Sequence, residues 1–290
     1  MPRIPEGTTY FSFIRIAHKA PALPILALSI VLVGIYYVLL HFLQAEIMEI
    51  DFKVPGFIVY VLGYVIALLF YFRLGNSYYR WYDGMKALYY LRANAESFGM
   101  KVRTYLSGRP EDVRYLCSMS VNYYRAMRDA VRHASDPSHL VPSTPGLQSE
   151  LEGKYHLPSQ VNSRIAARLS ELFREGAITR MQHLDLDRNI NRNTEWLSTC
   201  EVLKDTPPPP VYIIHLRGFI LFYAAMIPFG FIHELGIWMM LFLSIFFYFY
   251  AGMEIISEEV EDPFGFDPND LPVTDMTRIT EKRLAAILKN

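Results

Sequence analysis

The chain has few cysteines and lacks the common sequence motifs of enzymes. Its 290 residues include only two cysteines, Cys117 and Cys200. A disulfide framework is therefore excluded, and so low a content is typical of a protein whose polar region faces a reducing compartment. The chain has no glycine-rich phosphate loop, Cys-x-x-Cys pair, His-Glu-x-x-His or Gly-x-Ser-x-Gly pattern. We therefore predict that the protein is not an enzyme.

An excess of charge of either sign is also missing, since the formal net charge is −1. The arginines in the middle of the chain alternate with acidic residues, which argues against nucleic-acid binding. His183, Asp185 and Asp187 lie close together in the sequence and would suit a metal ion. On a charged helix end, however, such a group is more often solvated, and that is our expectation.

Charge is absent from four long stretches of a chain that is 52% hydrophobic. These stretches are residues 21–43, 54–72, 218–232 and 235–252. A membrane-spanning helix needs about 20 apolar residues, so the third stretch spans only with help from its flanks. The alternative is four buried helices of a soluble protein, but soluble core helices rarely lack charge all round over such lengths. We predict an integral membrane protein with four transmembrane helices.

The charges that flank the stretches indicate their orientation. Residues 1–20 are basic and lack a signal-peptide pattern, so we expect the first span to stay in the mature protein. Arg73, Arg80 and Lys86 follow the second span, whereas the loop between the first two spans is mostly acidic. The positive-inside rule then predicts that both termini and the long middle region are cytoplasmic.

The polar regions, residues 73–217 and 253–290, are predicted to be helical. Apolar residues recur at spacings of three and four, and no alternating strand pattern of any length occurs. Within the middle region we expect helices at 81–106, 112–134, 159–174 and 184–203, with a loop at 136–146. The predicted fold class is all-α. Because spans and polar helices are interleaved, we expect residues 1–290 to form a single integrated unit.

Three blocks of sequence stand in fixed positions relative to the predicted spans. FRLGNSYYRWYDG, residues 72–84, follows the second span, and TPPPPVYIIHLR, residues 206–217, precedes the third. EEVEDPFGFDPNDLP, residues 258–272, follows the fourth and is the most specific of the three. Their order and placement resemble those of the bestrophin family of ion channels. The resemblance covers most of the chain, but residues 106–197 match only in helical character.

The resemblance implies a homopentamer around a central pore, with four spans in each subunit. The short C-terminal region is similar to that of bacterial members, which implies the plasma membrane, with the chain crossing it several times. Tyr64, Leu68 and Phe72 lie four residues apart, so they share one face of a helix. By themselves these residues suit ordinary helix packing. The resemblance implies that they form apolar rings at a pore neck, a hydrophobic gate that conducts only when wetted.

Two further positions take a role from the resemblance alone. Pro208 occupies the place of the residue that forms a cytoplasmic aperture in relatives, although the run 207–210 also suits a simple helix stop. Asp267 and Asp270 match a calcium clasp of animal bestrophins; the alternative is that they cap the following helix and pair with Arg or Lys. No cofactor is required, and calcium is an optional ligand. Other acidic side chains here are expected to form a packed and solvated face: Glu254, Glu258, Glu259 and Glu261.

The resemblance predicts a passive channel for small monovalent ions, whose partners are further copies of the chain, membrane lipids and the permeant ions. Chloride is preferred over monovalent cations such as sodium because it is the common permeant ion of the family. The preference is narrow, since the acidic loop at 46–51 would favour cations if it lines the entrance. The alternative is a non-conducting membrane scaffold or lipid-interacting protein. In that alternative, basic residues near the membrane contact anionic headgroups: Arg15, Lys19, Arg73 and Arg80.

Overall fold

The protein is helical throughout the part that the structure describes. The computed structural model describes residues 31–32, 34–40, 42–43, 55–134, 136–143, 146–236, 238–267 and 269–289, without the side chains of 232 and 233. No strand occurs within these ranges, in agreement with the predicted all-α class. The described residues between 31 and 43 are helical, but most of the predicted first span, 21–43, lies outside the described residues.

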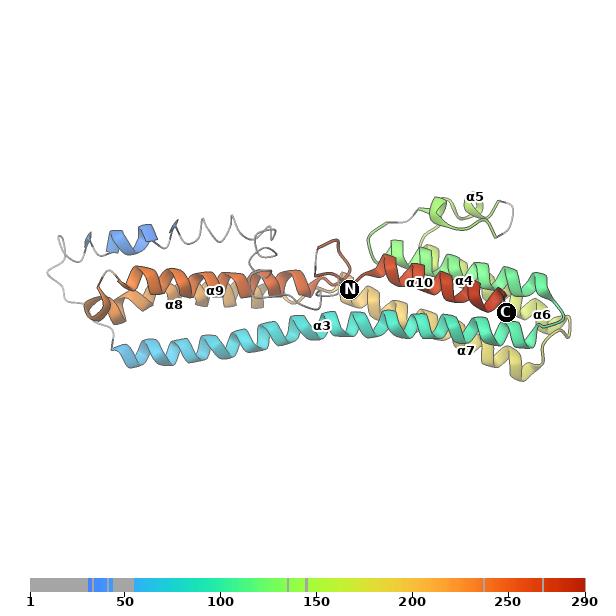
Figure 1. Cartoon of the computed structure of the whole chain (residues 1–290), viewed down its shortest axis with the longest axis horizontal. Coiled ribbons are helices and arrows are strands. Elements are labelled where there is room, and N and C mark those ends of the chain that lie inside the picture. The colour runs from blue at the N-terminus through green and yellow to red at the C-terminus, as the bar shows by residue number, and fades with distance from the viewer. Residues whose placement is uncertain are drawn as a thin grey trace. The chain divides into compact units, whose positions relative to one another are not determined.

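The elements follow one another with short connections (Figure 1). They are α3 (Gly56–Tyr105), α4 (Pro110–Ala130), the 3₁₀ turn η1 (Pro137–His139), α5 (Leu147–Leu151), α6 (Leu157–Arg174), α7 (Arg180–Asp205), α8 (Pro210–Leu235), α9 (Trp238–Glu261) and α10 (Val273–Lys289). The predicted helices at 112–134, 159–174 and 184–203 correspond to α4, α6 and α7. The predicted loop at 136–146 contains η1.

The chain divides into two compact units. The spanning unit comprises Met1–Tyr79 and Pro207–Glu261, and the bundle unit comprises Arg80–Thr206 and Asp262–Asn290. Helix α3 contributes to both units, and the chain passes between them three times. The expectation of a single integrated unit therefore stays a prediction.

Helix α3 joins the predicted second span and the first predicted polar helix without a break. Its 50 residues correspond to a length of about 75 Å at 1.5 Å per residue. The expected boundary between residues 72 and 81 does not exist, because no proline interrupts this segment. Gly84 lies inside the helix where a Cβ atom would approach Phe264 and Leu271 to 3.1 Å, so glycine allows close packing there.

The spanning unit contains three helices that are long and apolar enough to cross a membrane, and no further such helix occurs in the described ranges. They are α3, α8 and α9; α8 includes the predicted span 218–232, and α3 and α9 cover most of the predicted spans 54–72 and 235–252. Helix α8 begins at Pro210, earlier than predicted, because proline suits the first turn of a helix. Gly230 of α8 lies against α3, and a Cβ atom there would be 2.7 Å from Val59 Cγ2.

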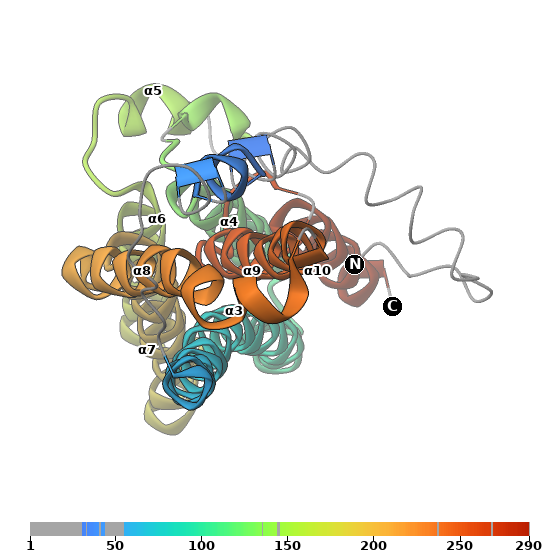
Figure 2. The same cartoon turned by 90° about the vertical axis from the view of Figure 1, so that its left-hand side faces the viewer.

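The bundle unit packs α4, α6, α7 and α10 with the second part of α3, as the end view in Figure 2 also shows. Its apolar core includes Leu91 of α3, Leu116 of α4 and Ile165 of α6. Helix α7 starts with a capping box, in which Thr179 and Gln182 bond to each other's backbone amides. Both cysteines are buried in this core, and burial raises the pKa of Cys117 to about 11 and of Cys200 to about 12.

Buried amide side chains cross the interior of the bundle unit. Asn94 of α3 donates to Asn193 Oδ1 at 2.8 Å and to the Asn189 carbonyl at 2.8 Å. Asn189 returns a bond to Asn94 Oδ1 at 2.7 Å, and the Tyr123 hydroxyl donates to the Asn193 carbonyl at 2.7 Å. Because a buried polar group costs free energy unless it is bonded, these pairings fix the register of α3, α4 and α7.

Candidate functional site

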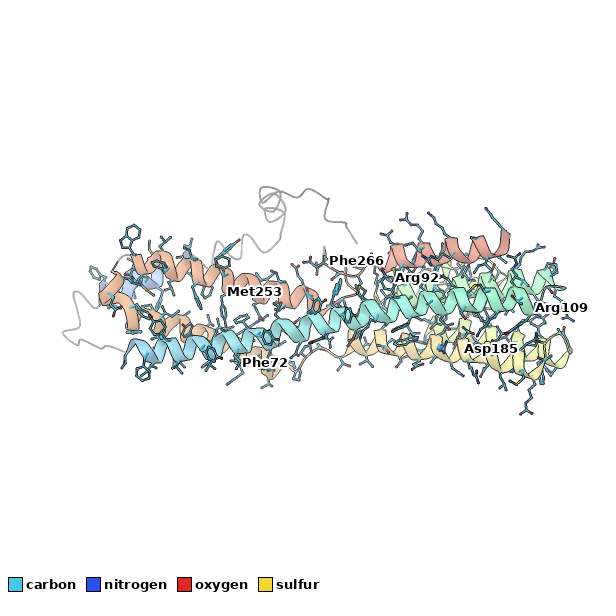
Figure 3. The ribbon with its side chains drawn as sticks, turned by 60° about the horizontal axis from the view of Figure 1, so that its bottom comes forward. Phe72, Arg92, Arg109, Asp185, Met253 and Phe266 are labelled. Atoms are coloured by element: carbon cyan, nitrogen blue, oxygen red, sulfur yellow. The ribbon has the colours of Figure 1, made fainter. Side chains whose placement is uncertain are left out.

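The predicted stripe forms an exposed apolar face of α3. Tyr64 is 74% exposed, Leu68 44% and Phe72 52%, although all three are large apolar or aromatic side chains. Ile66 and Phe70, at 2% and 8%, are buried against the other spanning helices. Two residues correspond to a turn of about 200° around a helix, so the stripe and the buried face lie on opposite sides of α3. Figure 3 shows Phe72 on α3 and Met253 on α9.

The residue after the stripe is a buried arginine. Arg73 is 2% exposed, and it pairs with two carboxylates of α9, Glu261 and Glu254, with 3.7 Å between Arg73 Nε and Glu254 Oε2. Arg217 of α8 joins the same group, because its Nε lies 3.0 Å from Glu254 Oε1 and its Nη2 lies 3.0 Å from Glu258 Oε2. We call these five residues the arginine–glutamate cluster. It connects all three spanning helices by charge.

Sequence reasoning missed this cluster. Arg73 was placed at lipid headgroups only in the alternative of a scaffold protein, whereas two carboxylates and the surrounding helices bury it. Glu254 and Glu261 were assigned to a packed and solvated face, and their burial supports only the packed part of that expectation. A signal was present, since residues 254 and 261 are seven apart and share a helix face. Their partner in α3 is too distant in sequence for any local pattern to reveal it.

The proline run separates two helices. Helix α7 ends at Asp205 and α8 begins at Pro210, which fits the helix-stop interpretation of the run. Pro208 is half-buried between these ends. In the bundle unit, Arg80 donates to the carbonyls of Leu203 and Thr206, at 3.1 Å for the latter, and so binds the last turn of α7. The assignment of Pro208 to an aperture stays a prediction.

The acidic turn is closed by its own side chain. Asp270 Oδ2 accepts a hydrogen bond from the Asp267 backbone amide at 2.5 Å. A Cβ atom on Gly265 would lie 2.8 Å from the same oxygen, so glycine is needed beside it. In the described part of the chain no three His, Cys, Asp or Glu side chains are grouped as metal ligands would be. Calcium prefers six to eight oxygen ligands, and this turn supplies few of them from carboxylates.

The first and third sequence blocks meet in the bundle unit. Trp81 Nε1 donates to the Asn269 carbonyl at 3.0 Å, and Gly84 packs against Phe264 and Leu271. Phe264 is 1% exposed, so the aromatic residue of the acidic block is a core residue. Several residues that make these two blocks distinctive in the sequence therefore serve to pack the blocks against each other.

The group His183, Asp185 and Asp187 is not assembled into a site. Asp185 Oδ1 lies 2.9 Å from Lys101 Nζ, and its other oxygen accepts the Tyr105 hydroxyl at 3.0 Å. The hydrogen bond from Lys101 is the main reason why the pKa of Asp185 is lowered. The Asp185 carboxylate on α7 therefore connects this helix to α3 within the bundle unit, and Figure 3 labels it there.

Comparison with known proteins shows the family to which the chain belongs. The model of the bacterial and fungal bestrophin proteins matches residues 9–286. The chain belongs to the bestrophin family. This bestrophin is 28% identical over 216 residues to a voltage-dependent anion channel-forming protein of Nostoc, covering 72% of this chain and 70% of that one. It is 27% identical over 221 residues to the voltage-dependent anion channel-forming protein YneE of Escherichia coli, covering 73% and 70%.

Solved structures show the same fold. A variant of a bacterial bestrophin homologue from Klebsiella pneumoniae superimposes with a TM-score of 0.83 at 20% identity, covering 93% of this chain and 100% of that one. Another variant of that homologue gives a TM-score of 0.82 at 21% identity, with the same coverage of both chains. The resemblance drawn from the three sequence blocks is thus confirmed, as is a membrane protein with transmembrane helices.

Proposed function

We propose that this bestrophin is a passive anion channel, a homopentamer in which α3 of each subunit lines a central pore. Tyr64, Leu68 and Phe72 form the rings of its neck. The family and the names of the relatives, which are called anion channel-forming proteins, support the ion class. The residues 21–43 supply the fourth span, both termini are cytoplasmic, and the chain crosses the plasma membrane among lipids that cover its outer faces.

The exposed stripe is the observation that carries the proposal. A lone subunit leaves Tyr64, Leu68 and Phe72 uncovered, and the stripe continues at the same spacing to the exposed polar residue Asn76. Polar side chains of membrane helices face a bundle interior or water more often than lipid. A face that is apolar and then polar suits a pore neck that widens into a wetted region. Each copy contributes one α3, so several copies must surround the axis.

Reversal potentials test the ion and the neck together. Purified protein, shown by native mass spectrometry to contain five copies, is reconstituted in planar bilayers under a KCl gradient. We expect currents that reverse near the chloride equilibrium potential, and a changed conductance in Phe72→Ala. Phe249→Ala is the matched control, because Phe249 is an equally large side chain, 66% exposed on α9 and outside the stripe. This control should conduct like the wild type.

The other outcomes are equally clear. Reversal near the potassium equilibrium potential would mean that the channel conducts cations, and the assignment of the neck to Tyr64, Leu68 and Phe72 would stand. Silence from verified, inserted pentamers would overturn the channel and favour the scaffold. That alternative has lost support at two of its four basic residues, because Arg73 is buried with carboxylates and Arg80 donates to backbone carbonyls.

We also propose that conduction requires no calcium. The Asp270 carboxylate closes its own turn through the Asp267 amide, so this turn needs no ion to hold its shape. Pro208, at the entry to α8, forms the cytoplasmic aperture. We expect bilayer currents to be unchanged, within about twofold, when EGTA replaces micromolar calcium on the cytoplasmic side. A loss of current on chelation that is restored by calcium, and is absent in Asp267→Asn, would make the turn a calcium site.

A further inference from the structure

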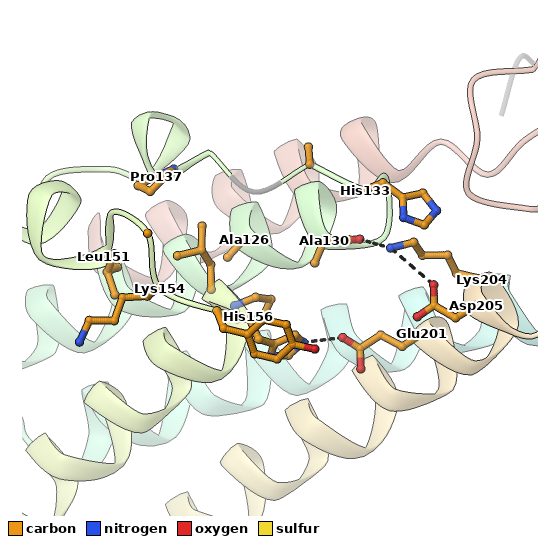
Figure 4. Close-up of a pocket in the computed structure, with 15 residues that line it drawn as sticks. Ala126, Ala130, His133, Pro137, Leu151, Lys154, His156, Glu201, Lys204 and Asp205 are labelled. Carbon is orange, nitrogen blue, oxygen red and sulfur yellow. Dashed lines mark hydrogen bonds and ion pairs between the residues drawn. The ribbon is translucent and has the colours of Figure 1, made fainter.

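The bundle unit contains a cavity that has no part in the proposed pore. Its volume is about 700 Å³, within the range of small-molecule pockets. The end of α4, the loop before α6 and the last turns of α7 line it (Figure 4). Ala126, Leu151 and Leu157 give it an apolar wall. Its polar side chains come from two histidines, two lysines, two acids and one tyrosine.

Both of its histidines have unusual backbone conformations. His133 and His156 have φ angles of 55° and 57°, and no other non-glycine residue in the described part of the chain has a positive φ. Left-handed conformations strain most side chains, and they gather at functional sites. Both strained residues line this one cavity.

His133 stands where a helix end usually has glycine. The amides of His133 and Ala134 bond back to the carbonyls of Ala130 and Asp129, at 3.3 and 2.8 Å, as they do in a Schellman motif. Glycine is the common residue at the left-handed position of that motif, because it has no Cβ. A histidine at this position strains the backbone, but it places an imidazole at the cavity.

His156 likewise stands where a capping residue is usual. It precedes α6 but makes no side-chain cap to that helix. Its ring instead bonds to Ser159 Oγ at 2.6 Å and to Glu201 Oε1 at 2.5 Å. The second bond engages the Glu201 carboxylate, one of the two acids in the cavity.

The remaining side chains leave the cavity with an excess of donors. The Lys204 side chain is 11% exposed; its Nζ donates to the Ala130 carbonyl at 2.6 Å and lies 3.8 Å from Asp205. An ammonium group has three N–H donors, so Lys204 has donors left for a ligand. In the described part of the chain no hydrogen bond or ion pair occupies the side chains of His133 or Lys154. In the view of Figure 4, His133 lies near Lys204 and Lys154 toward the opposite side.

We propose that this cavity binds a small organic oxyanion, a carboxylate or phosphate carried on a compact apolar body. Lys204 and His133 donate to the oxyanion, the apolar wall contacts the body, and Lys154 at the opposite side attracts the anion by its charge alone. Charge-assisted hydrogen bonds of this kind are short and strong, and burial of Lys204 strengthens them. His156 holds Glu201 and reduces its repulsion of the anion.

Calorimetry on the detergent-solubilised full chain tests this site. The probes are benzoate and phenyl phosphate, which separate carboxylate from phosphate recognition, with benzyl alcohol as the uncharged control. We expect one of the two anions to bind with one site per chain and benzyl alcohol to show no binding. If neither anion binds, the proposal is wrong.

His133→Gly separates a ligand-binding role from a structural one. Glycine relieves the left-handed strain, so the melting temperature should rise, whereas loss of the imidazole should weaken anion binding by about tenfold, as expected for one lost hydrogen bond to a charged group. A variant that binds like the wild type would overturn the proposal. Conduction in bilayers is not needed for either readout.

Lys154→Met gives a second and independent test. It removes an exposed side chain that has no hydrogen bond or ion pair in the described part of the chain, so the fold should be unaffected. Loss of its charge at the cavity should weaken binding of the anion, but by less than in His133→Gly, because no hydrogen bond to the anion is lost. Lys282→Met is its matched control, since Lys282 is an exposed lysine of α10 outside the cavity lining. Equal effects of the two substitutions would mean that net charge alone attracts the anion, and would also overturn the proposal.

Discussion

At the residue scale, Arg73 is a charged side chain that is buried in the spanning unit and paired with two carboxylates. It lies next to Phe72 in sequence, yet the two side chains differ sharply, at 2% and 52% exposure. An arginine cannot lose its charge in a protein, so its burial depends on Glu254 and Glu261. The same contacts fix the rotation of α3 about its own axis, and with it the direction in which Phe72 points.

We expect Arg73→Met to lower stability more than Arg217→Met. Removal of one partner from a buried ion pair costs about 3 to 5 kcal/mol, because uncompensated carboxylates stay behind. The Arg217 side chain is 46% exposed, so water replaces much of its interaction. Melting of the detergent-solubilised protein, followed by intrinsic fluorescence, measures both. Equal decreases, or no decrease for Arg73→Met, would contradict this account of the cluster.

The limits of sequence reasoning are visible at this same scale. The spacing of Tyr64, Leu68 and Phe72 indicated a shared helix face, which the exposures of these residues confirm. Whether that face lines a pore depends on other copies of the chain, so no property of one sequence could decide it. The strained conformations of His133 and His156 have no sequence signature, since histidine is an ordinary residue in loops. The cavity was therefore not predicted.

At the element scale, local patterns predicted most helices but misplaced the end of one. Helices α4, α6 and α7 match their predicted ranges within a few residues, because apolar periodicity and prolines mark their ends. Helix α3 was expected to end near residue 72. Its continuity follows from the absence of proline in the segment after residue 72. The packing of Gly84 against Phe264 and Leu271 adds a non-local contact that no local pattern reveals.

The contact between α3 and α7 should weaken in acid. The hydrogen bond from Lys101 lowers the pKa of Asp185 below the ordinary aspartate value of about 3.9. A carboxylate with a lowered pKa stabilises the folded state above its unfolded pKa, and this contribution is lost as the pH falls through the folded pKa. We therefore expect hydrogen exchange in the first turns of α7, corrected for intrinsic rates, to accelerate below about pH 4.

Two neighbouring aspartates of α7 provide the comparison. Asp185→Asn should exchange faster at pH 7 and lose the acid-dependent acceleration, because an amide cannot form the ion pair with Lys101. Asp187→Asn should behave like the wild type, since Asp187 accepts a bond from the Asn191 amide at 3.2 Å on the same helix. An unchanged acid response in Asp185→Asn would assign the effect to another group.

At the scale of the whole molecule, two sets of contacts join segments that lie far apart in the sequence. The blocks at 72–84 and 258–272 pack together in the bundle unit, and the arginine–glutamate cluster joins three helices in the spanning unit. Family membership was predictable because these blocks are contiguous in sequence. The cluster was not, because its members come from three helices. The number of copies, the permeant ion and the fourth span belong to the assembly in its membrane, and the bilayer experiment addresses them there.

The burial of both native cysteines makes the natural chain suitable for site-directed labelling. Cys117 and Cys200 are 1% and 0% exposed, and with raised pKa values they are rarely thiolates near neutral pH. A thiol reagent should therefore leave the folded wild type almost unmodified. A cysteine introduced as Leu68→Cys would be the single reactive thiol in each chain, so its rate of modification by a charged reagent applied from one side would report directly on access of water to the stripe.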